Sequence, residues 1–287
     1  MALATTASLS LVAVGGAEAA EPAPYSPVVI HAPDKDTLLR NLDRVFRDEM
    51  HTPFAEQLID LWHGKLMQHR EVINYRLDGE LINVLLQFSV LPGAERDWSL
   101  VQVALIDITA RKKAEAYLEY LGKHDVLTQL RNRAYFEDEL NRLERKGPWP
   151  VTIVAIDLNR LKATNDQAGH AAGDALLRRA GEVLGKVADK PACAARIGGD
   201  EFVLLMPGED ERAGAAMIER VQSLVDLNNQ YYPGALLSLA MGCATGQSGE
   251  RLEAVVSRAD ERMFAAKRDF YTQSGLDRRT RPAPLDD

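Results

Sequence analysis

The chain is organised around one short stretch, Arg196-Ile197-Gly198-Gly199-Asp200-Glu201-Phe202. One apolar run, residues 192–195, leads into it, and another, residues 203–206, leads out. Two strand-like runs joined by Gly-Gly predict a tight β-hairpin with a primed turn, because glycine adopts positive φ without steric cost. The two acids that follow place adjacent carboxylates at a rigid tip, which favours a divalent cation. Taken alone, the same residues also fit an ordinary solvated turn.

The residues Gly198-Gly199-Asp200-Glu201-Phe202 also spell the signature of the GGDEF family, and the chain resembles a diguanylate cyclase with an N-terminal PAS-like sensor domain. The resemblance covers residues 124–281 and keeps both order and spacing. Its matching segments are His124–Thr128, Asn132-Arg133, Asp157–Asp166, Gly169-His170, Gly173-Asp174, Ala259-Asp260 and Ala266-Lys267. It implies an α/β (α+β) fold in which helices flank a central sheet like that of nucleotidyl cyclases.

The composition is that of a folded protein with two domains. The chain has 287 residues, of which 46% are hydrophobic and 26% charged, and this length suits two ordinary domains. A net charge of −8 and a pI near 5.4 argue against a nucleic-acid partner, which calls for a basic surface. Cys193 and Cys243 lie in apolar runs and are expected to be reduced core residues. No stretch reaches the length of a membrane-spanning helix.

The beginning of the chain raises the question of export. Residues 1–20 are apolar and end in Ala17-Glu18-Ala19-Ala20, which resembles a signal-peptide cleavage site, but they lack the basic start of such peptides. Export would also separate a GTP-consuming domain from its substrate. We therefore expect a cytoplasmic protein.

Residues 1–108 predict a smaller α+β domain. A short strand and a turn are expected within residues 7–16, and apolar residues recur at helical spacing over residues 36–66. Three strand-like runs follow with turn signals between them, which predicts an antiparallel meander; they are residues 71–76, 81–90 and 98–106. Such an order, ending in Asp107-Ile108-Thr109, resembles a PAS sensor domain of unknown ligand. A dimerisation domain without a ligand is the alternative.

Residues 109–123 predict a linker helix. They are rich in helix formers, and Ala114, Leu118 and Leu121 recur at helical spacing. An apolar stripe between two domains suits a short coiled coil that couples them. The expected domains are therefore residues 1–108, the linker 109–123, the cyclase domain 124–281 and a tail, 282–287.

In the C-terminal half, residues 150–157 form a nearly continuous apolar run that ends in Asp157. Such a run suits a central strand covered on both faces. It would bring Asp157 to the sheet edge beside Asp200, where hard oxygen ligands bind Mg²⁺. The resemblance implies Asp157, Asp200 and the Leu158 carbonyl as ligands of two Mg²⁺ ions per site, with Mn²⁺ as an alternative, and Asp200 and Glu201 as catalytic residues.

The following segment predicts a site for a nucleotide. Loop amides and Lys162 are expected to meet phosphates; the phosphate-binding residues that the resemblance implies are Asn159, Arg160, Leu161, Lys162 and Lys267. Asn165 and Asp174 match the guanine readers of the family, and their carboxylate and amide suit the guanine edge, so GTP is preferred over ATP. Helices are expected over residues 175–187 and 209–227, and a strand over residues 235–243.

Three positions depart from the family pattern. Asn159 and Leu161 replace an Asp and a Phe, and Tyr271 stands where the family commonly has an arginine, for which Arg268 is a substitute nearby. These departures support a competing interpretation, a catalytically degenerate module that binds GTP or cyclic di-GMP and signals by contact. The intact Asp157, signature and Lys267 oppose it.

The resemblance implies that two GTP are condensed into cyclic di-GMP and two pyrophosphates. Each domain offers one nucleotide site, so a homodimer is expected, regulated by the N-terminal domain. Many relatives also carry an Arg-x-x-Asp pair that binds inhibitory product. The corresponding positions here are Asp189 and Ala192, which lack the planar fork that grips a phosphate, and we expect no inhibitory product site.

Overall fold

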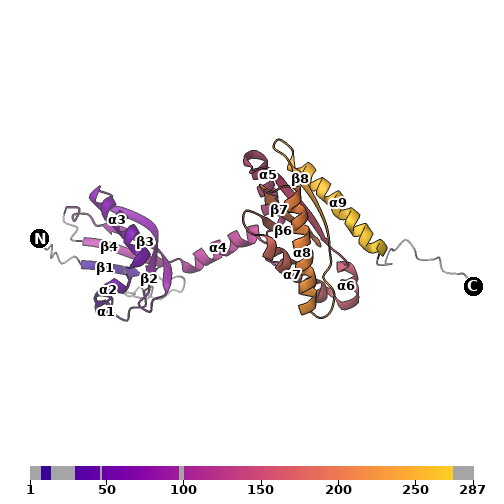
Figure 1. Cartoon of the computed structure of the whole chain (residues 1–287). Helices are drawn as coiled ribbons and strands as arrows, with labels where there is room; N and C mark the ends of the chain where they lie inside the picture. Colours follow the sequence, from indigo (N-terminus) through magenta and orange to yellow (C-terminus); the bar gives the residue numbers. More distant parts are fainter. Residues whose placement is uncertain (1–7, 14–29, 46, 97–99, 274–287) are drawn as a thin grey trace, which may run out of the picture. The chain divides into compact units, whose positions relative to one another are not determined.

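The structure is a computed structural model that describes residues 8–13, 30–45, 47–96 and 100–273 (Figure 1). The chain divides into two compact units, residues 1–117 and 118–287. The apolar segment that ends in Ala17-Glu18-Ala19-Ala20 and the expected tail 282–287 lie outside the described residues. In the part of the chain that is described, no helix combines the length and the apolar character needed to cross a membrane.

The first unit contains a four-stranded sheet in the order β1-β4-β3-β2. Its strands are β1 (Ser8–Ala13), β2 (Met67–Tyr75), β3 (Leu81–Val90) and β4 (Leu100–Asp107). The predicted antiparallel meander is present as β2-β3-β4. The strand expected within residues 7–16 is β1, which pairs in parallel with β4 at the edge of the sheet.

The helical expectation over residues 36–66 is only partly correct. The segment forms separate pieces: α1 (Lys35–Arg40), α2 (Leu42–Val45), the 3₁₀ turn η2 (Asp48–Met50) and α3 (His51–Trp62). Asp34 caps α1 by accepting the Thr37 N–H at 2.7 Å. A positive φ of 49° at Asp48 interrupts the helical path before α3 begins. Leu38, Val45, Met50 and Leu61 of these pieces are buried, whereas Phe54, Leu58 and Trp62 of α3 are exposed. The apolar spacing therefore indicated helices but not one continuous buried face.

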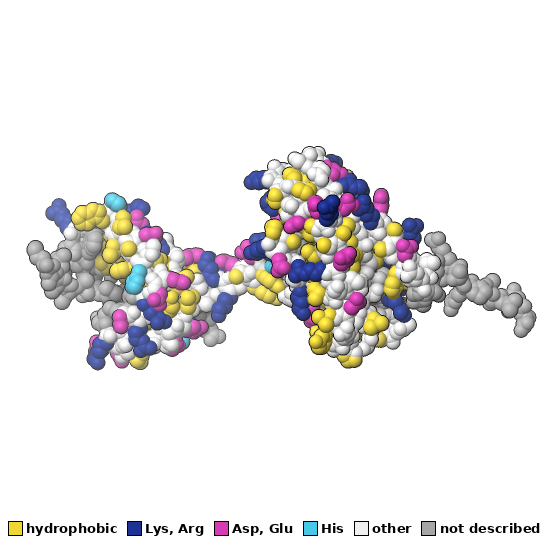
Figure 2. All heavy atoms as spheres, viewed as in Figure 1, with side chains coloured by type: hydrophobic (Ala, Val, Ile, Leu, Met, Phe, Trp, Pro, Cys, Tyr) yellow, Lys and Arg dark blue, Asp and Glu magenta, His cyan; other side chains and the backbone are white. Residues whose placement is uncertain are grey.

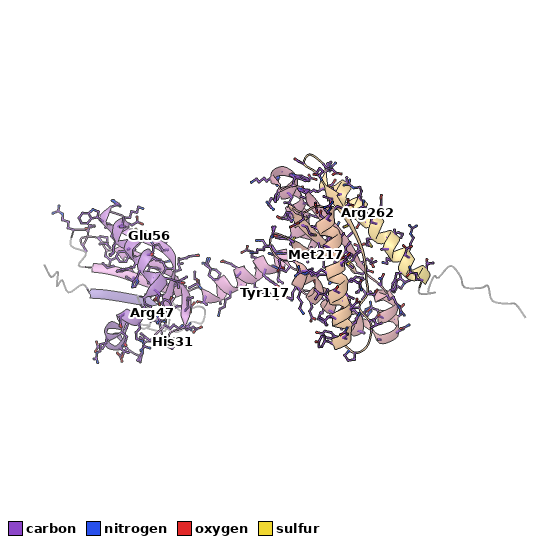
Figure 3. The ribbon with its side chains drawn as sticks, viewed as in Figure 1. His31, Arg47, Glu56, Tyr117, Met217 and Arg262 are labelled. Carbon is purple, nitrogen blue, oxygen red and sulfur yellow. The ribbon has the colours of Figure 1, made fainter. Side chains whose placement is uncertain are left out.

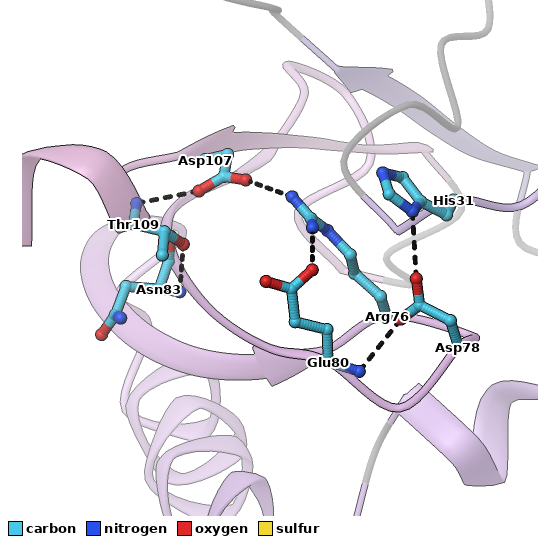
Figure 4. Close-up of polar contacts among 7 residues, drawn as sticks. All are labelled: His31, Arg76, Asp78, Glu80, Asn83, Asp107 and Thr109. Atoms are coloured by element: carbon cyan, nitrogen blue, oxygen red, sulfur yellow. Dashed lines mark hydrogen bonds and ion pairs between the residues drawn. The ribbon is translucent and has the colours of Figure 1, made fainter. Parts of the chain in front are cut away.

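A polar cluster closes the end of β4 (Figure 4). Asp107 accepts the Thr109 N–H at 2.8 Å and a guanidinium N–H of Arg76 at 2.9 Å. The Thr109 hydroxyl accepts the Asn83 N–H of β3 at 2.9 Å. Burial by itself raises the pKa of Asp107, but the Thr109 hydrogen bonds and the Arg76 charge outweigh it, so this pKa lies below its usual value. The Asp-Ile-Thr segment thus fixes the start of α4 (Thr109–Lys123).

Helix α4 exposes apolar side chains along its length. None of its residues is fully buried, and Tyr117, labelled in Figure 3, is 59% exposed beside Leu118 at 66%. Its last turn belongs to the second unit. There the Tyr120 ring stacks on His124 with centroids 4.0 Å apart, and His124 Nδ1 lies 3.0 Å from the Tyr120 carbonyl oxygen.

The second unit is an antiparallel sheet flanked by helices, the mixed α/β fold that the sequence predicts. Its order is β6-β7-β5-β8. The strands are β5 (Val151–Leu158), β6 (Cys193–Arg196), β7 (Glu201–Pro207) and β8 (Leu239–Gly246). The helices are α5 (Arg133–Lys146), α6 (Leu161–Ala168), α7 (His170–Val187), α8 (Glu211–Tyr231) and α9 (Leu252–Gln273).

Every residue of β5 is buried, which confirms the prediction of a central strand covered on both faces. Alternate residues serve the two faces, as the pleat of a strand requires. Val154, Ile156 and Leu158 pack in one core cluster with α7 and α8. Ile153 and Ala155 pack in another with α5 and α9.

The contact between α9 and the sheet is unusually close at Gly242. A Cβ atom there would lie 2.1 Å from the Met263 backbone nitrogen, so the helix rests on the backbone of β8. Arg262, labelled in Figure 3, secures the same helix by donating to the Cys243 carbonyl at 2.6 Å and to Glu211 of α8 at 2.8 Å.

Several element boundaries in this unit differ from the prediction. Residues 235–238 are irregular, and β8 spans Leu239–Gly246 rather than residues 235–243. Helix α7 begins at His170 rather than at residue 175, and α8 spans Glu211–Tyr231 rather than residues 209–227. On the face drawn in Figure 2, lysine and arginine side chains are interspersed with acids rather than gathered in one patch.

Candidate active site

The signature forms the turn between β6 and β7. Strand pairing places Arg196 opposite Phe202, and the N–H groups of Ile197 and Gly198 donate to the Glu201 carbonyl at 2.9 and 3.3 Å. The hairpin is confirmed, but the predicted primed turn is wrong, because neither glycine has a positive φ. A Cβ at Gly198 would lie 2.4 Å from a Glu201 carboxylate oxygen, the movable end of that side chain. A Cβ at Gly199 would meet nothing within 4 Å.

Arg196 supports this turn, a role that could not be seen in the sequence. Its guanidinium donates to the carbonyls of Gly198 at 3.1 Å and Gly199 at 2.8 Å. The same group contacts both carboxylate oxygens of Asp125, at 3.2 and 3.3 Å. Burial raises the pKa of Asp125, but hydrogen bonds from Thr128 and the Arg196 charge lower it overall. Both Asp125 and Arg196 lie in motifs that the sequence singled out, yet their pairing across the fold left no signal.

Asp157 lies next to the turn because of the strand register. It pairs with Glu201 across β5 and β7, and the Leu158 N–H donates to the Asp200 carbonyl at 2.9 Å. Asp157 is buried and only 5% exposed. Burial is the main reason why the pKa of Asp157 is raised; repulsion from Asp200 and Glu201 adds to it, while Lys267 opposes it.

Lys267 of α9 is the cation at this carboxylate. Its Nζ lies 2.6 Å from Asp157 Oδ1. The sequence could place Lys267 on a helix but not against Asp157. Asp260, two turns earlier on α9, belongs to the same acidic surroundings, since burial and the Glu201 charge raise its pKa.

Unpartnered oxygen atoms gather in this region. Among the described residues, four buried side-chain polar atoms have no hydrogen-bond partner, and three of them are the Oδ1 atoms of Asp157, Asn159 and Asn165. Lys267 is close to Asp157 Oδ1, but the contact lacks the geometry of a hydrogen bond. Buried acceptors without donors are rare in folded proteins and call for a ligand, an ion or water. All three lie between the end of β5 and the end of α6.

The oxygen donors suit a hard cation such as Mg²⁺. In the described part of the chain, no three acidic, histidine or cysteine side chains are gathered as a preformed metal centre. The predicted ligands include only two side chains, those of Asp157 and Asp200, together with the Leu158 carbonyl. Lys267 already provides a positive charge next to Asp157.

In the turn after β5, Asn159 is hydrogen-bonded to Ser238. Its N–H donates to the Ser238 carbonyl at 2.9 Å and its side-chain amide donates to the Ser238 hydroxyl at 3.0 Å. This N–H is therefore engaged within the protein. Arg160 follows in the left-handed conformation, and Leu161 and the exposed Lys162 begin α6.

The two predicted guanine readers are brought to the same corner by close packing of α6 against α7. A Cβ at Gly173 would lie 2.0 Å from the Asn165 Oδ1 atom, so any other residue there would displace the Asn165 side chain. Asp174, the next residue, is half exposed and lies 3.8 Å from Arg178.

Comparison with known proteins identifies the class. A model of the family described as "Diguanylate cyclase, GGDEF domain" matches residues 122–272, and the chain belongs to the GGDEF family. A crystal structure of the coiled coil and GGDEF domain of DgcB from Caulobacter crescentus, in complex with c-di-GMP, is 27% identical with a TM-score of 0.52. It matches 56% of this chain and 89% of that one.

Curated relatives include proteins named as cyclases. The probable diguanylate cyclase DgcE of Escherichia coli is 34% identical over 63% of this chain and 17% of its own length. The diguanylate cyclase DgcP of Pseudomonas aeruginosa is 34% identical over 50% of this chain and 22% of its own. The uncharacterized protein Rv1354c of Mycobacterium tuberculosis is 34% identical over 78% and 37%. The chain thus spans only a minor part of the length of these relatives.

Proposed function

We propose that this chain is a diguanylate cyclase that condenses two GTP into cyclic di-GMP and two pyrophosphates. Family membership supports the proposal, and one observation carries it. The register of β5 and β7 brings the buried Asp157 beside Asp200 and Glu201 of the signature, which unites a strand-end acid with the acids of the turn.

In each of two successive steps, the 3′-hydroxyl of one nucleotide attacks the α-phosphorus of the other. A new O–P bond forms, the bond to the bridging oxygen breaks, and pyrophosphate leaves. We assign Asp200 or Glu201 to accept the hydroxyl proton. Asp157, Asp200 and the Leu158 carbonyl would hold Mg²⁺, or Mn²⁺ in its place, which would acidify the hydroxyl and neutralise phosphoryl charge.

The nucleotide would be held from both ends. Asn165 and Asp174 face the guanine edge, where a carboxylate accepts from the N1–H and N2–H₂ groups. The amides that begin α6, together with Lys162 and Lys267, receive the phosphates, since helix N-termini and lysines favour anions. Binding would draw Lys267 away from Asp157 and free that carboxylate.

The remaining parts of the proposal concern assembly. One nucleotide site per domain calls for a homodimer that orients two GTP toward each other. Because the domain would consume GTP, we place the protein in the cytoplasm. Residues 1–108 would act as a PAS-like sensor or dimerisation domain, and residues 109–123, within α4, as the linker to the cyclase domain 124–281. The exposed Tyr117 and Leu118 of α4 support a role for this helix in pairing.

The test is incubation of the purified full chain with GTP and Mg²⁺, followed by separation of the nucleotides. We expect one cyclic di-GMP for every two pyrophosphates released, with Asp200→Asn as the inactive control. Binding of GTP without product would favour the degenerate module instead, which the engaged Asn159 N–H and Tyr271 support. Neither binding nor product would contradict both functions.

A further inference from the structure

Tyr271 brings a hydroxyl group from α9 to the beginning of α6. The Arg160 N–H donates to the Tyr271 hydroxyl oxygen at 3.3 Å. Tyr271 follows Lys267 by one helical turn and so lies on the same side of α9. Because Lys267 contacts Asp157, α9 holds the segment 157–161, here called the β5–α6 turn, at two points.

Helix α6 lacks a cap of its own. The first four N–H groups of a helix have no partner within it, and a Ser, Thr, Asp or Asn side chain commonly accepts one of them. Here the capping position is Arg160, which makes no side-chain capping bond. The Tyr271 hydroxyl accepts the first of these N–H groups from another helix.

The conformation of Arg160 needs such support. Its φ of 64° and ψ of 13° lie in the left-handed region, which costs a residue other than glycine on the order of 1 kcal/mol and persists only where the surroundings impose it. On one side Asn159 is tied to Ser238, and on the other Tyr271 holds the Arg160 N–H.

The same left-handed conformation is of the kind found in anion-binding nests. When a left-handed residue is followed by right-handed ones, successive N–H groups converge on one point, as in the nests that bind phosphates. The side chain of Asn159, a residue only 2% exposed, adds a buried Oδ1 atom without a partner at this turn. The β5–α6 turn therefore has the backbone conformation of a nest, while the Asn159 oxygen calls for a donor or a cation rather than for a phosphate oxygen.

We propose that Tyr271 is a positioning residue for the triphosphate: by holding the Arg160 N–H, it keeps the first amides of α6 aimed at the phosphate oxygens. The inference rests on the proposed function and deepens its phosphate site. Tyr271, which departs from the family pattern, thereby has a role of its own. Its neutral hydroxyl group supports the turn without adding a positive charge to the phosphate site.

The test is Tyr271→Phe in the full chain, which removes the hydroxyl and keeps the ring. We expect the Kd of a non-hydrolysable GTP analogue to rise about three- to tenfold, the effect of one lost hydrogen bond. The Kd of GMP should stay unchanged, because GMP lacks the terminal phosphates. In turnover, KM for GTP should rise while kcat stays near its parental value.

Tyr232→Phe is the matched control, because it removes a hydroxyl that donates to Glu182 at 3.0 Å, between α8 and α7. Its Kd for the analogue should be parental. A purely structural role of Tyr271 would change the affinity for GMP as well, or Tm alone. An unchanged or lower Kd for the analogue in Tyr271→Phe overturns the proposal, the lower value meaning that the hydroxyl competes with phosphate. Failure of the parental chain to bind the analogue overturns the proposed function too.

Discussion

Asp107 and Asp157 both lie at the end of an inner strand, β4 in one unit and β5 in the other, yet their surroundings are opposite. Asp107 is hydrogen-bonded by Arg76 and Thr109, and its pKa is lowered. Asp157 is buried with an oxygen that no hydrogen bond satisfies, and its pKa is raised. Asp107 is hydrogen-bonded within its own unit, whereas Asp157 has the single charge of Lys267 beside it and an oxygen without a hydrogen bond.

The largest expected effect is a loss of turnover, which should distinguish Asp157 from Asp107. Asp157→Asn and Asp200→Asn should each reduce cyclic di-GMP formation by more than about 100-fold, since even the outer partners of metal ligands are worth about 10- to 100-fold. The amide removes charge without removing volume, so circular dichroism should show an intact fold. Asp107→Asn, the matched control, should retain parental affinity for GTP. Parental turnover in Asp157→Asn or Asp200→Asn would show that the metal assignment is wrong.

A second effect concerns the base. The double variant Asn165→Ala with Asp174→Ala should weaken GTP binding by at least about 10- to 100-fold, because one hydrogen bond to the charged Asp174 alone contributes roughly 1.5–3 kcal/mol. Preference over ATP should decline with it. A competition titration measures both, with Asp166→Ala on the same helix as the control. Unchanged preference would remove these two residues from guanine recognition.

A third variant tests the support of the signature turn. Arg196→Lys keeps the charge but loses the planar fork that contacts Asp125 and two carbonyls. We expect the free energy of unfolding to fall by about 1–3 kcal/mol and turnover to fall with it, because the turn that carries Asp200 loosens. Urea denaturation and initial rates are the measurements. The exposed Arg212→Lys provides a control, and equal stability of the two variants would contradict the role of Arg196.

A smaller effect is expected at Asp107 and depends on pH. Asp107→Asn should lower the free energy of unfolding by about 0.5–1.5 kcal/mol at neutral pH, the usual value of a hydrogen bond. The folded-state pKa of Asp107 is lowered from 3.8, so its contribution is present above that value and is lost as pH falls through the folded pKa. Denaturation curves of parent and variant should therefore converge in acid. A difference that persists there would contradict the linkage.

The last prediction is that added cyclic di-GMP does not inhibit the reaction. Initial rates with cyclic di-GMP added at the start should match those without it, because Asp189 and Ala192 lack the arginine fork and its paired acid. In the structure Asp189 is mostly exposed and lies 3.5 Å from Arg220. Strong non-competitive inhibition that survives Asp189→Ala would reveal a second product site.

Much of the second unit could be predicted from local pattern. The apolar run that ends in Asp157 specified a strand covered on both faces, and Gly-Gly between strand-like runs specified the hairpin. The turn conformation could not be predicted, because neither Gly198 nor Gly199 adopts the positive φ that Gly-Gly usually indicates. In the first unit, the positive φ of Asp48 divides a helical pattern whose apolar spacing continues unbroken.

The contacts of α9 were beyond the reach of sequence. Spacing showed that Lys267 and Asp260 share one side of a helix, but only packing could show that Lys267 contacts Asp157 or that Tyr271 meets the Arg160 N–H. Likewise, the tie between Asn159 and Ser238 joins positions distant in the chain. Motifs identify which residues matter, while long-range packing decides which of them meet.

The close contact at Gly242 has a consequence for how this protein can vary. The atoms nearest to a Cβ at that position belong to the backbone of residues 259, 262 and 263, so no rotamer change can make room for it. A single methyl group there would act as a wedge and lift the whole helix, taking Lys267 and Tyr271 away from the β5–α6 turn. A substitution on the exposed face of α9 leaves this contact unchanged, whereas any side chain at position 242 would disturb residues that lie far from it.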